Sequence, residues 1–174
     1  MKTSLSTLAV AALALLSGCA EMPKYSQDTL PEAVKVPAGF KVAMETVGVG
    51  EITYECRAKA AMASEFEWAF VGPKAVLNDR GGKYYGPPAT WEASDGSKIT
   101  GTQLAVAPSS AGNIPLQLVK ANAAMGAGAM SGVSHIQRVA TRGGTAPALP
   151  CGAGSAGQKQ VVNYQADYIF WKAV

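Results

Sequence analysis

The sequence predicts an all-β domain, a single antiparallel sandwich or barrel with long loops rich in Gly, Ala and Pro and room for one short helix. Apolar residues recur at every second position in many short runs, and turn residues separate these runs. Glycine is abundant, at 19 of 174 residues. Residues 37–174 have the length of one ordinary domain.

The first predicted strands cover residues 40–45 and 51–56, where apolar and polar side chains alternate. We expect the segment 47–50, with its two glycines, to form the turn between them. The same alternation predicts further strands at 66–71, 74–77, 83–85, 90–93, 98–106, 133–141 and 161–173.

The last of these runs is the longest, and its alternation is typical of a half-buried strand. One face carries Val162, Tyr164, Ala166, Tyr168 and Phe170, and the other carries Gln165 and Asp167. The stretch 114–125 fits both a helix and a strand. Asn, Asp and Gly at 78–82 and 95–97 predict tight turns, and small residues at 125–132 and 143–158 predict loops.

The N-terminus has the three parts of a secretory signal peptide. Lys2 supplies the positive start, residues 5–16 are apolar apart from small polar residues, and Leu16-Ser17-Gly18 precedes Cys19. This arrangement resembles the lipobox of bacterial lipoproteins, in which the signal peptide, here residues 1–18, is removed and the cysteine carries lipid. The resemblance implies a lipid bilayer as the partner of acylated Cys19.

Several acyl chains, at about 0.8 kcal/mol per buried methylene, are enough for stable anchoring. Ala20 is not the aspartate that resembles an inner-membrane retention signal, which favours the outer membrane. Residues 19–36 are polar, contain two prolines and have no clear period, so we expect a lipidated N-terminus and a flexible tether. The fold should begin near Pro37.

Charge and cysteine content limit the partners of the mature chain. Removal of the signal peptide lowers the formal net charge from +3 to about +2, and the basic residues are scattered, so no nucleic-acid partner is expected. With Cys19 lipidated, Cys56 and Cys151 form an even pair in an oxidising compartment, which predicts a disulfide. A redox pair and a metal site are the alternatives, but there is no C-x-x-C motif and only one histidine.

Several stretches together carry a family resemblance. They read VPAGFKVAMETVGVGEITYEC, WAF, AVLNDRGG, YYGPPATWEASDGSKITG, SHIQRVATRGG and YQADYIFW. From Pro37 to Trp171 the chain resembles the domain-of-unknown-function family DUF3455, and W-E-A-x-D-G-S and I-Q-R-V are its most specific parts. The resemblance implies a secreted or surface protein without an established activity.

Some fungal relatives in that family carry a malate dehydrogenase label, which raises the question of a dinucleotide cofactor. The fingerprint G-x-G-x-x-G must lie between a strand and a helix. Gly126 and Gly128 come closest, but Gly132 is one place late and a predicted strand follows it. No cofactor is therefore expected.

His135 and Arg138 are candidates for chemistry on the predicted strand 133–141. Ser134 is next to His135, but neighbours along a strand point to opposite faces, so we expect a histidine hydrogen-bonded locally rather than a nucleophile and its base. Arg138 is either an anchor for a carboxylate or phosphate or the partner of an acid such as Asp167 or Glu92.

Trp91, Glu92 and Asp95 form the other candidate group. The two acids could act as the pair of a glycosidase if they lay about 5–9 Å apart in a cleft, with Trp91 as a sugar platform. The simpler interpretation places Trp91 in the core or at its rim and Asp95 in a hairpin turn.

The leading hypothesis is a non-enzymatic envelope lipoprotein that binds an envelope glycan or protein or contributes to surface structure. The alternative is an extracytoplasmic hydrolase or carbohydrate-active enzyme that uses paired carboxylates near Trp91, with Arg138 recognising substrate. An enzyme should bring Glu92, Asp95, His135 or Arg138 together in one concave pocket.

Overall fold

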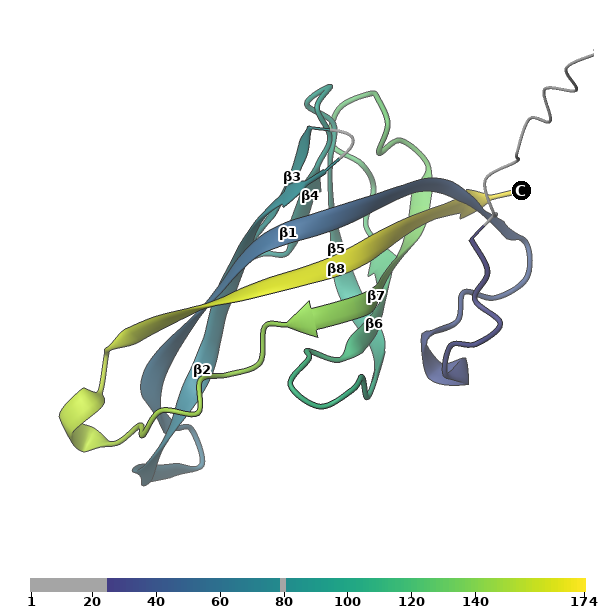
Figure 1. Cartoon of the computed structure of the whole chain (residues 1–174). Coiled ribbons are helices and arrows are strands. Elements are labelled where there is room, and N and C mark those ends of the chain that lie inside the picture. The colour runs from purple at the N-terminus through teal and green to yellow at the C-terminus, as the bar shows by residue number, and fades with distance from the viewer. Residues whose placement is uncertain (1–24, 79–80) are drawn as a thin grey trace, which may run out of the picture.

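The computed structural model describes residues 25–78 and 81–174. These residues form a closed antiparallel barrel in which each strand pairs with the next and the last pairs with the first (Figure 1). The strands are β1 (Phe40–Lys59), β2 (Met62–Leu77), β3 (Gly82–Tyr85), β4 (Thr90–Glu92), β5 (Lys98–Ala107), β6 (Leu116–Ala121), β7 (Val133–Gly143) and β8 (Lys159–Ala173). Two 3-10 turns, η1 (Glu32–Val34) and η2 (Ala153–Ser155), accompany them. The all-β prediction is confirmed, and the architecture is a barrel rather than a sandwich.

The alternation predicted for the last strand is confirmed in β8. The residues from Val162 to Phe170 at even positions belong to the cluster inside the barrel, whereas Ile169 and Trp171 belong to a second cluster outside it. The ambiguous stretch is strand β6, in which Leu118 faces the outer cluster and Val119 the inner one.

The predicted turn at 47–50 is wrong, because β1 continues through it. Gly48 pairs with Leu77 and Ala166, and Gly50 pairs with Ala75 and Tyr164. A Cβ atom on Gly48 would lie 2.5 Å from the Tyr168 ring, and one on Gly50 would overlap the backbone of β2. Both glycines therefore permit close approach within the sheet, and neither makes a turn.

The interior of the barrel is rich in aromatic side chains. Trp91 stacks on Tyr84 with ring centroids 4.8 Å apart, and Tyr168 contacts both rings at 5.1 Å from Tyr84 and 6.1 Å from Trp91. Such pairs add to the free energy of burial, by about 0.5–1.5 kcal/mol each. The aromatic group therefore fills the barrel beside β3 and β4, where the strands are shortest.

The segment from Tyr25 to Val36, which we call the N-terminal strap, packs on the outside of the barrel instead of forming a flexible tether. Val34 and Val36 are buried in the outer cluster. The Gln27 side chain accepts a hydrogen bond from the Val36 amide and donates one to the Val36 carbonyl. Composition suggested a linker here, but the segment buries apolar side chains against the barrel, because Tyr25 and Leu30 pack on the same cluster as the two valines.

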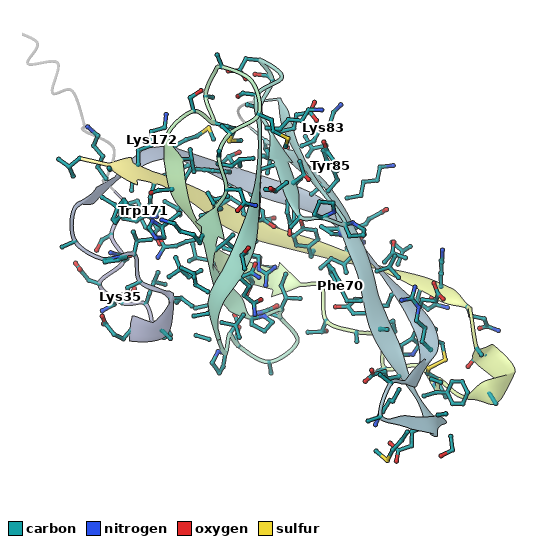
Figure 2. The ribbon with its side chains drawn as sticks, turned by 180° about the vertical axis from the view of Figure 1, so that it is seen from behind. Lys35, Phe70, Lys83, Tyr85, Trp171 and Lys172 are labelled. Carbon is teal, nitrogen blue, oxygen red and sulfur yellow. A yellow bond between two sulfur atoms is a disulfide. The ribbon has the colours of Figure 1, made fainter. Side chains whose placement is uncertain are left out.

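A buried glutamine connects the strap to the barrel wall. Gln137 on β7 is 0% exposed. Its amide nitrogen donates to the Val34 carbonyl at 2.6 Å, and its oxygen accepts from Trp171 at 2.9 Å and Tyr25 at 3.2 Å. Figure 2 shows Trp171 on the side that the strap covers. These bonds compensate the desolvation of the amide, so the strap is part of the folded unit.

Strands β1, β2 and β8 extend past the barrel body as a projecting arm, at the lower left of Figure 1. A disulfide joins Cys56 to Cys151, as predicted, and fixes the loop after β7 to the arm. The Trp68 indole donates to the Leu149 carbonyl at 2.8 Å in the same region. In the chain-entropy description a loop of this length contributes about 4 to 5 kcal/mol to stability.

The role of Gly50 can be tested by a substitution that adds a single methyl group. We expect Gly50→Ala to lower the free energy of unfolding by about 1–3 kcal/mol, since β2 would have to move away from β1. Gly154→Ala is the control, because its added Cβ meets no atom within 4 Å. Urea denaturation of both variants gives the comparison, and equal stabilities would contradict the close-approach interpretation.

Candidate functional site

The structure separates the five residues that the sequence singles out. Trp91 lies in the barrel core, 1% exposed, and cannot serve as a sugar platform. Its indole nitrogen has no hydrogen-bond partner among the described residues. The interpretation of Trp91 as a core residue is the one that its position supports.

Glu92 points away from the barrel interior and is engaged locally. Its carboxylate accepts a hydrogen bond from the Tyr85 hydroxyl at 2.9 Å and lies 3.2 Å from the Lys98 ammonium. These two donors hold the pKa of Glu92 below its usual range. The expected pairing of Glu92 with Arg138 is wrong, because the two side chains lie on opposite faces of the barrel wall.

Asp95 holds the β4–β5 hairpin turn, as expected from Asp95-Gly96-Ser97. One carboxylate oxygen accepts from the Ser97 amide at 2.9 Å and the Ser97 hydroxyl at 2.6 Å. The other accepts from the Ala129 amide at 2.7 Å, which ties the 125–132 loop to the turn. The hydrogen bond from the Ser97 side chain, supported by those backbone amides, lowers the pKa of Asp95.

Ser134 and His135 contact each other, contrary to the argument from strand alternation. The pairing of β7 with β8 skips between Val133 and His135, and this bulge turns the Ser134 hydroxyl to 3.1 Å from His135 Nδ1. The hydroxyl also lies 3.2 Å from the Trp171 carbonyl, which can only accept; when the hydroxyl donates there, Nδ1 is the donor to Ser134.

His135 thus contacts Ser134 locally and does not line the cavity that faces Arg138. Its ring lies edge-on against Phe40, with centroids 4.6 Å apart, on the outer side of the barrel. Burial, with a smaller effect of Lys120, lowers the pKa of His135. The neutral, locally bonded histidine has the structural role that the sequence favoured.

Arg138 faces the barrel interior and has no acidic partner among the described residues. Its Nε and Nη2 atoms donate to the Pro115 carbonyl at 3.3 and 3.0 Å. Asp167, the other expected partner, lies outside the barrel beside Tyr25 and Glu45, where burial raises its pKa. Arg138 and Asp167 sit on neighbouring strands but on opposite faces, which prevents the ion pair.

A cavity of about 290 Å³ opens at the mouth of the barrel in front of Arg138. Strands β2, β3, β5, β6 and β7 and the loop 86–89 contribute to it. Its lining consists of Phe70, Pro73, Tyr84, Gly86, Pro87, Ala89, Gln103, Gln117 and Arg138. We call it the mouth cavity. Phe70 lies where β2 passes from the barrel body into the arm (Figure 2), and it is 57% exposed.

Four tyrosines lie within electrostatic range of Arg138: Tyr54, Tyr84, Tyr164 and Tyr168. Burial raises the pKa of each phenol, so all four are neutral at physiological pH. The Tyr54 hydroxyl donates to the Gly144 carbonyl at 2.8 Å, and the Tyr164 and Tyr168 hydroxyls lie 3.3 Å apart. Arg138 is thus a single cation among neutral polar groups.

Comparison with known families gives one match, to the family described as "Protein of unknown function (DUF3455)", over residues 37–84 and 81–172. The chain belongs to the DUF3455 family. No curated protein and no solved structure matches this DUF3455 chain.

The mouth cavity of this DUF3455 barrel was only partly foreseeable. Alternation placed Arg138 on the same face as Ile136, which was the available signal for an inward arginine. Phe70, Gln103 and Gln117 carried no signal, because their meeting depends on how the barrel closes. The residues around Trp91, which the sequence made prominent, do not form a site.

Residues 25–78 and 81–174 contain no group of three or more His, Cys, Asp or Glu side chains placed to hold a metal ion. Neither 3-10 turn within these ranges has the length or hydropathy of a membrane-spanning helix.

The role of Asp95 predicts a defined pH dependence. Asp95→Ala should lower the melting temperature, because the Ser97 and Ala129 amides lose their acceptor. A depressed pKa contributes stability that is fully present above about pH 4, the ordinary range of aspartate, and is lost as the pH falls through the lower folded value. The difference between wild type and variant should therefore be constant from neutral pH to about pH 5 and shrink below about pH 4.

Asp28→Ala is the control for this measurement, since the Asp28 carboxylate has no hydrogen bond or ion pair among the described residues and should leave the melting temperature unchanged. Thermal melts followed by circular dichroism give the values. An equal effect of the two substitutions would contradict the turn-clamp role of Asp95.

Proposed function

We propose that this DUF3455 protein is a lipid-anchored protein of the cell envelope, at the outer membrane, whose barrel binds a small ligand in the mouth cavity without converting it. The observation that carries the proposal is the mouth cavity itself. It is mostly apolar, and its wall contains Arg138, which has no acidic partner among the described residues. Sites of this kind, mostly apolar with a few convergent polar groups, are typical of small-molecule binding.

The placement of the candidate residues supports binding rather than hydrolysis. Glu92 and Asp95 are engaged by Tyr85, Lys98, Ser97 and Ala129, and neither lines the mouth cavity. The cavity lining offers Arg138 and Tyr84 as its titratable groups, and the Tyr84 phenol is held neutral by burial. A general acid and a base would both be needed for the alternative enzyme.

The size of the cavity narrows the proposed ligand. At about 290 Å³ it is at the lower end of the range for small-molecule sites. It accommodates a small molecule, or one terminal group of an envelope glycan or protein. The sequence suggested an envelope glycan or protein as the ligand, and the cavity volume limits the bound part to a small group.

The proposal of lipid anchoring rests on the lipobox, and Cys19 lies outside the described residues. The strap begins at Tyr25, and the six Cα–Cα steps from Cys19 to Tyr25 span at most about 21 Å. An anchor at Cys19 would therefore hold the barrel close to the bilayer surface.

Filling the mouth cavity tests the binding site. The neutral dye N-phenyl-1-naphthylamine fluoresces more strongly in apolar surroundings, and we expect wild-type protein to enhance its emission. Ala89→Trp should abolish most of this enhancement, because the indole occupies the cavity that Ala89 lines. Ala60→Trp, at the exposed tip between β1 and β2, should retain it. Equal enhancement by both variants would show that the dye binds elsewhere and would refute the cavity as the site.

Lipidation has a separate test. In a bacterial host, an alkynyl palmitate analogue should label the wild-type protein, and Cys19→Ala should lose the label and remain in the soluble fraction. Cys56→Ala is a matched control, since it removes another cysteine and should keep the label. Persistent labelling of Cys19→Ala would contradict the anchor.

A further inference from the structure

We infer that the ligand of the mouth cavity is a small monocarboxylate with a planar apolar body, and that Arg138 binds its carboxylate. This inference rests on the proposed binding function of the cavity. It adds the chemical class of the ligand and the residue that selects it.

The hydrogen bonds of Arg138 leave one complete fork of donors unused. A guanidinium has five N–H groups. The Pro115 carbonyl accepts from Nε and Nη2, which is the side edge of the group. The two Nη1 hydrogens and the second Nη2 hydrogen have no partner among the described residues, so the end edge is free. That edge presents two parallel N–H groups, which match the two oxygens of a carboxylate.

The surroundings of Arg138 favour an anion over a neutral ligand. No carboxylate of the described residues lies within ion-pair distance of it, and the neighbouring phenols are neutral. The Arg138 guanidinium lies at the solvent-exposed mouth, where it contacts the Pro115 carbonyl, and an anion that enters the cavity there gains a favourable Coulomb interaction with it.

One arginine fork suits a carboxylate better than a phosphate. A phosphate brings up to two charges and three acceptor oxygens, and usually requires several donors. Besides Arg138, the polar side chains of the cavity wall are Tyr84, Gln103 and Gln117, and the last two are hydrogen-bonded to each other at 2.7 Å. The cavity therefore offers one charge and one fork, beside the remaining amide hydrogens of the two glutamines.

The rest of the wall fits a flat apolar body. Phe70 and Tyr84 contribute aromatic rings, and Pro73, Pro87 and Ala89 contribute aliphatic surface. A large aromatic side chain such as Phe70, more than half exposed at the rim, gains by stacking against an entering ring. The volume of about 290 Å³ suits a ligand of one or two rings.

A pair of isosteric probes separates charge from shape. We would measure 2-naphthoate and its neutral analogue 2-naphthamide by isothermal titration calorimetry with purified wild-type protein. Wild type should bind 2-naphthoate at least about ten-fold more tightly than 2-naphthamide, which is the ratio expected for one charge-assisted fork. Equal affinities, or no binding of 2-naphthoate, would overturn the inference.

Three variants then assign the selectivity to Arg138. Arg138→Gln should bind both probes with equal, weak affinity, and Arg138→Lys, which keeps the charge but loses the fork, should keep only part of the preference. Arg142→Gln removes a charge from the exposed side of the same strand and should behave as wild type. A preference for 2-naphthoate that survives in Arg138→Gln would overturn the inference.

If Arg138→Gln does not fold, Arg138→Lys still tests the inference. A full preference of Arg138→Lys for 2-naphthoate would contradict binding through the guanidinium fork. The neutral dye separates the hypothesis that the mouth cavity binds ligands from the hypothesis that Arg138 selects carboxylates. If wild type fails to prefer 2-naphthoate while Ala89→Trp still excludes the dye, the cavity binds ligands but not acids. If Ala89→Trp leaves dye binding unchanged, the proposed binding site itself is wrong.

Discussion

Pairing of β1 with β8 closes the barrel, and this closure is the constraint on which the rest of the structure depends. The ladder runs from Phe40 opposite Ala173 to Glu55 opposite Lys159, so it engages nearly all of both strands. Gly48 and Gly50 make it possible, because the Tyr168 ring and the β2 backbone leave no room for side chains there. A closed sheet has no free edge and directs alternate side chains of every strand into one interior. The mouth cavity, whose wall comes from five strands, exists only because of this closure.

The outer surface of the same wall explains why the chain before β1 is ordered. Val139, Ile169 and Trp171 point outward from β7 and β8 and would present an apolar patch to water. The N-terminal strap covers them, and Gln137 supplies the specific hydrogen bonds that fix its position. Because the strap is fixed to the wall in this way, the proposed lipid anchor at Cys19 would limit the distance between the barrel wall and the membrane.

Alternation predicted the fold class and the faces of β8 because that strand is long and has one apolar face. It failed where the local rule depends on a distant partner. A glycine within a strand cannot be distinguished in sequence from a glycine in a turn. The requirement for glycine at position 48 comes from the Tyr168 ring, which is distant in sequence. The bulge that brings Ser134 to His135 likewise follows from register across strands. The disulfide was predictable because an even cysteine pair allows few arrangements.

The mouth cavity contains two polar arrangements, the uncharged Gln103–Gln117 pair and the charged Arg138 side chain, and their difference in charge bears on the role of the cavity. The Gln117 side-chain nitrogen donates to the Gln103 side-chain oxygen, which links β6 to β5 at the barrel rim through uncharged groups. Arg138 stands opposite Gln117 on the neighbouring strand, and its one hydrogen-bond partner among residues 25–78 and 81–174 is a neutral carbonyl. A third amide could donate to the Pro115 carbonyl equally well without bringing a charge to the cavity. The free donors of Arg138 are therefore best explained by an anion that arrives from outside the chain.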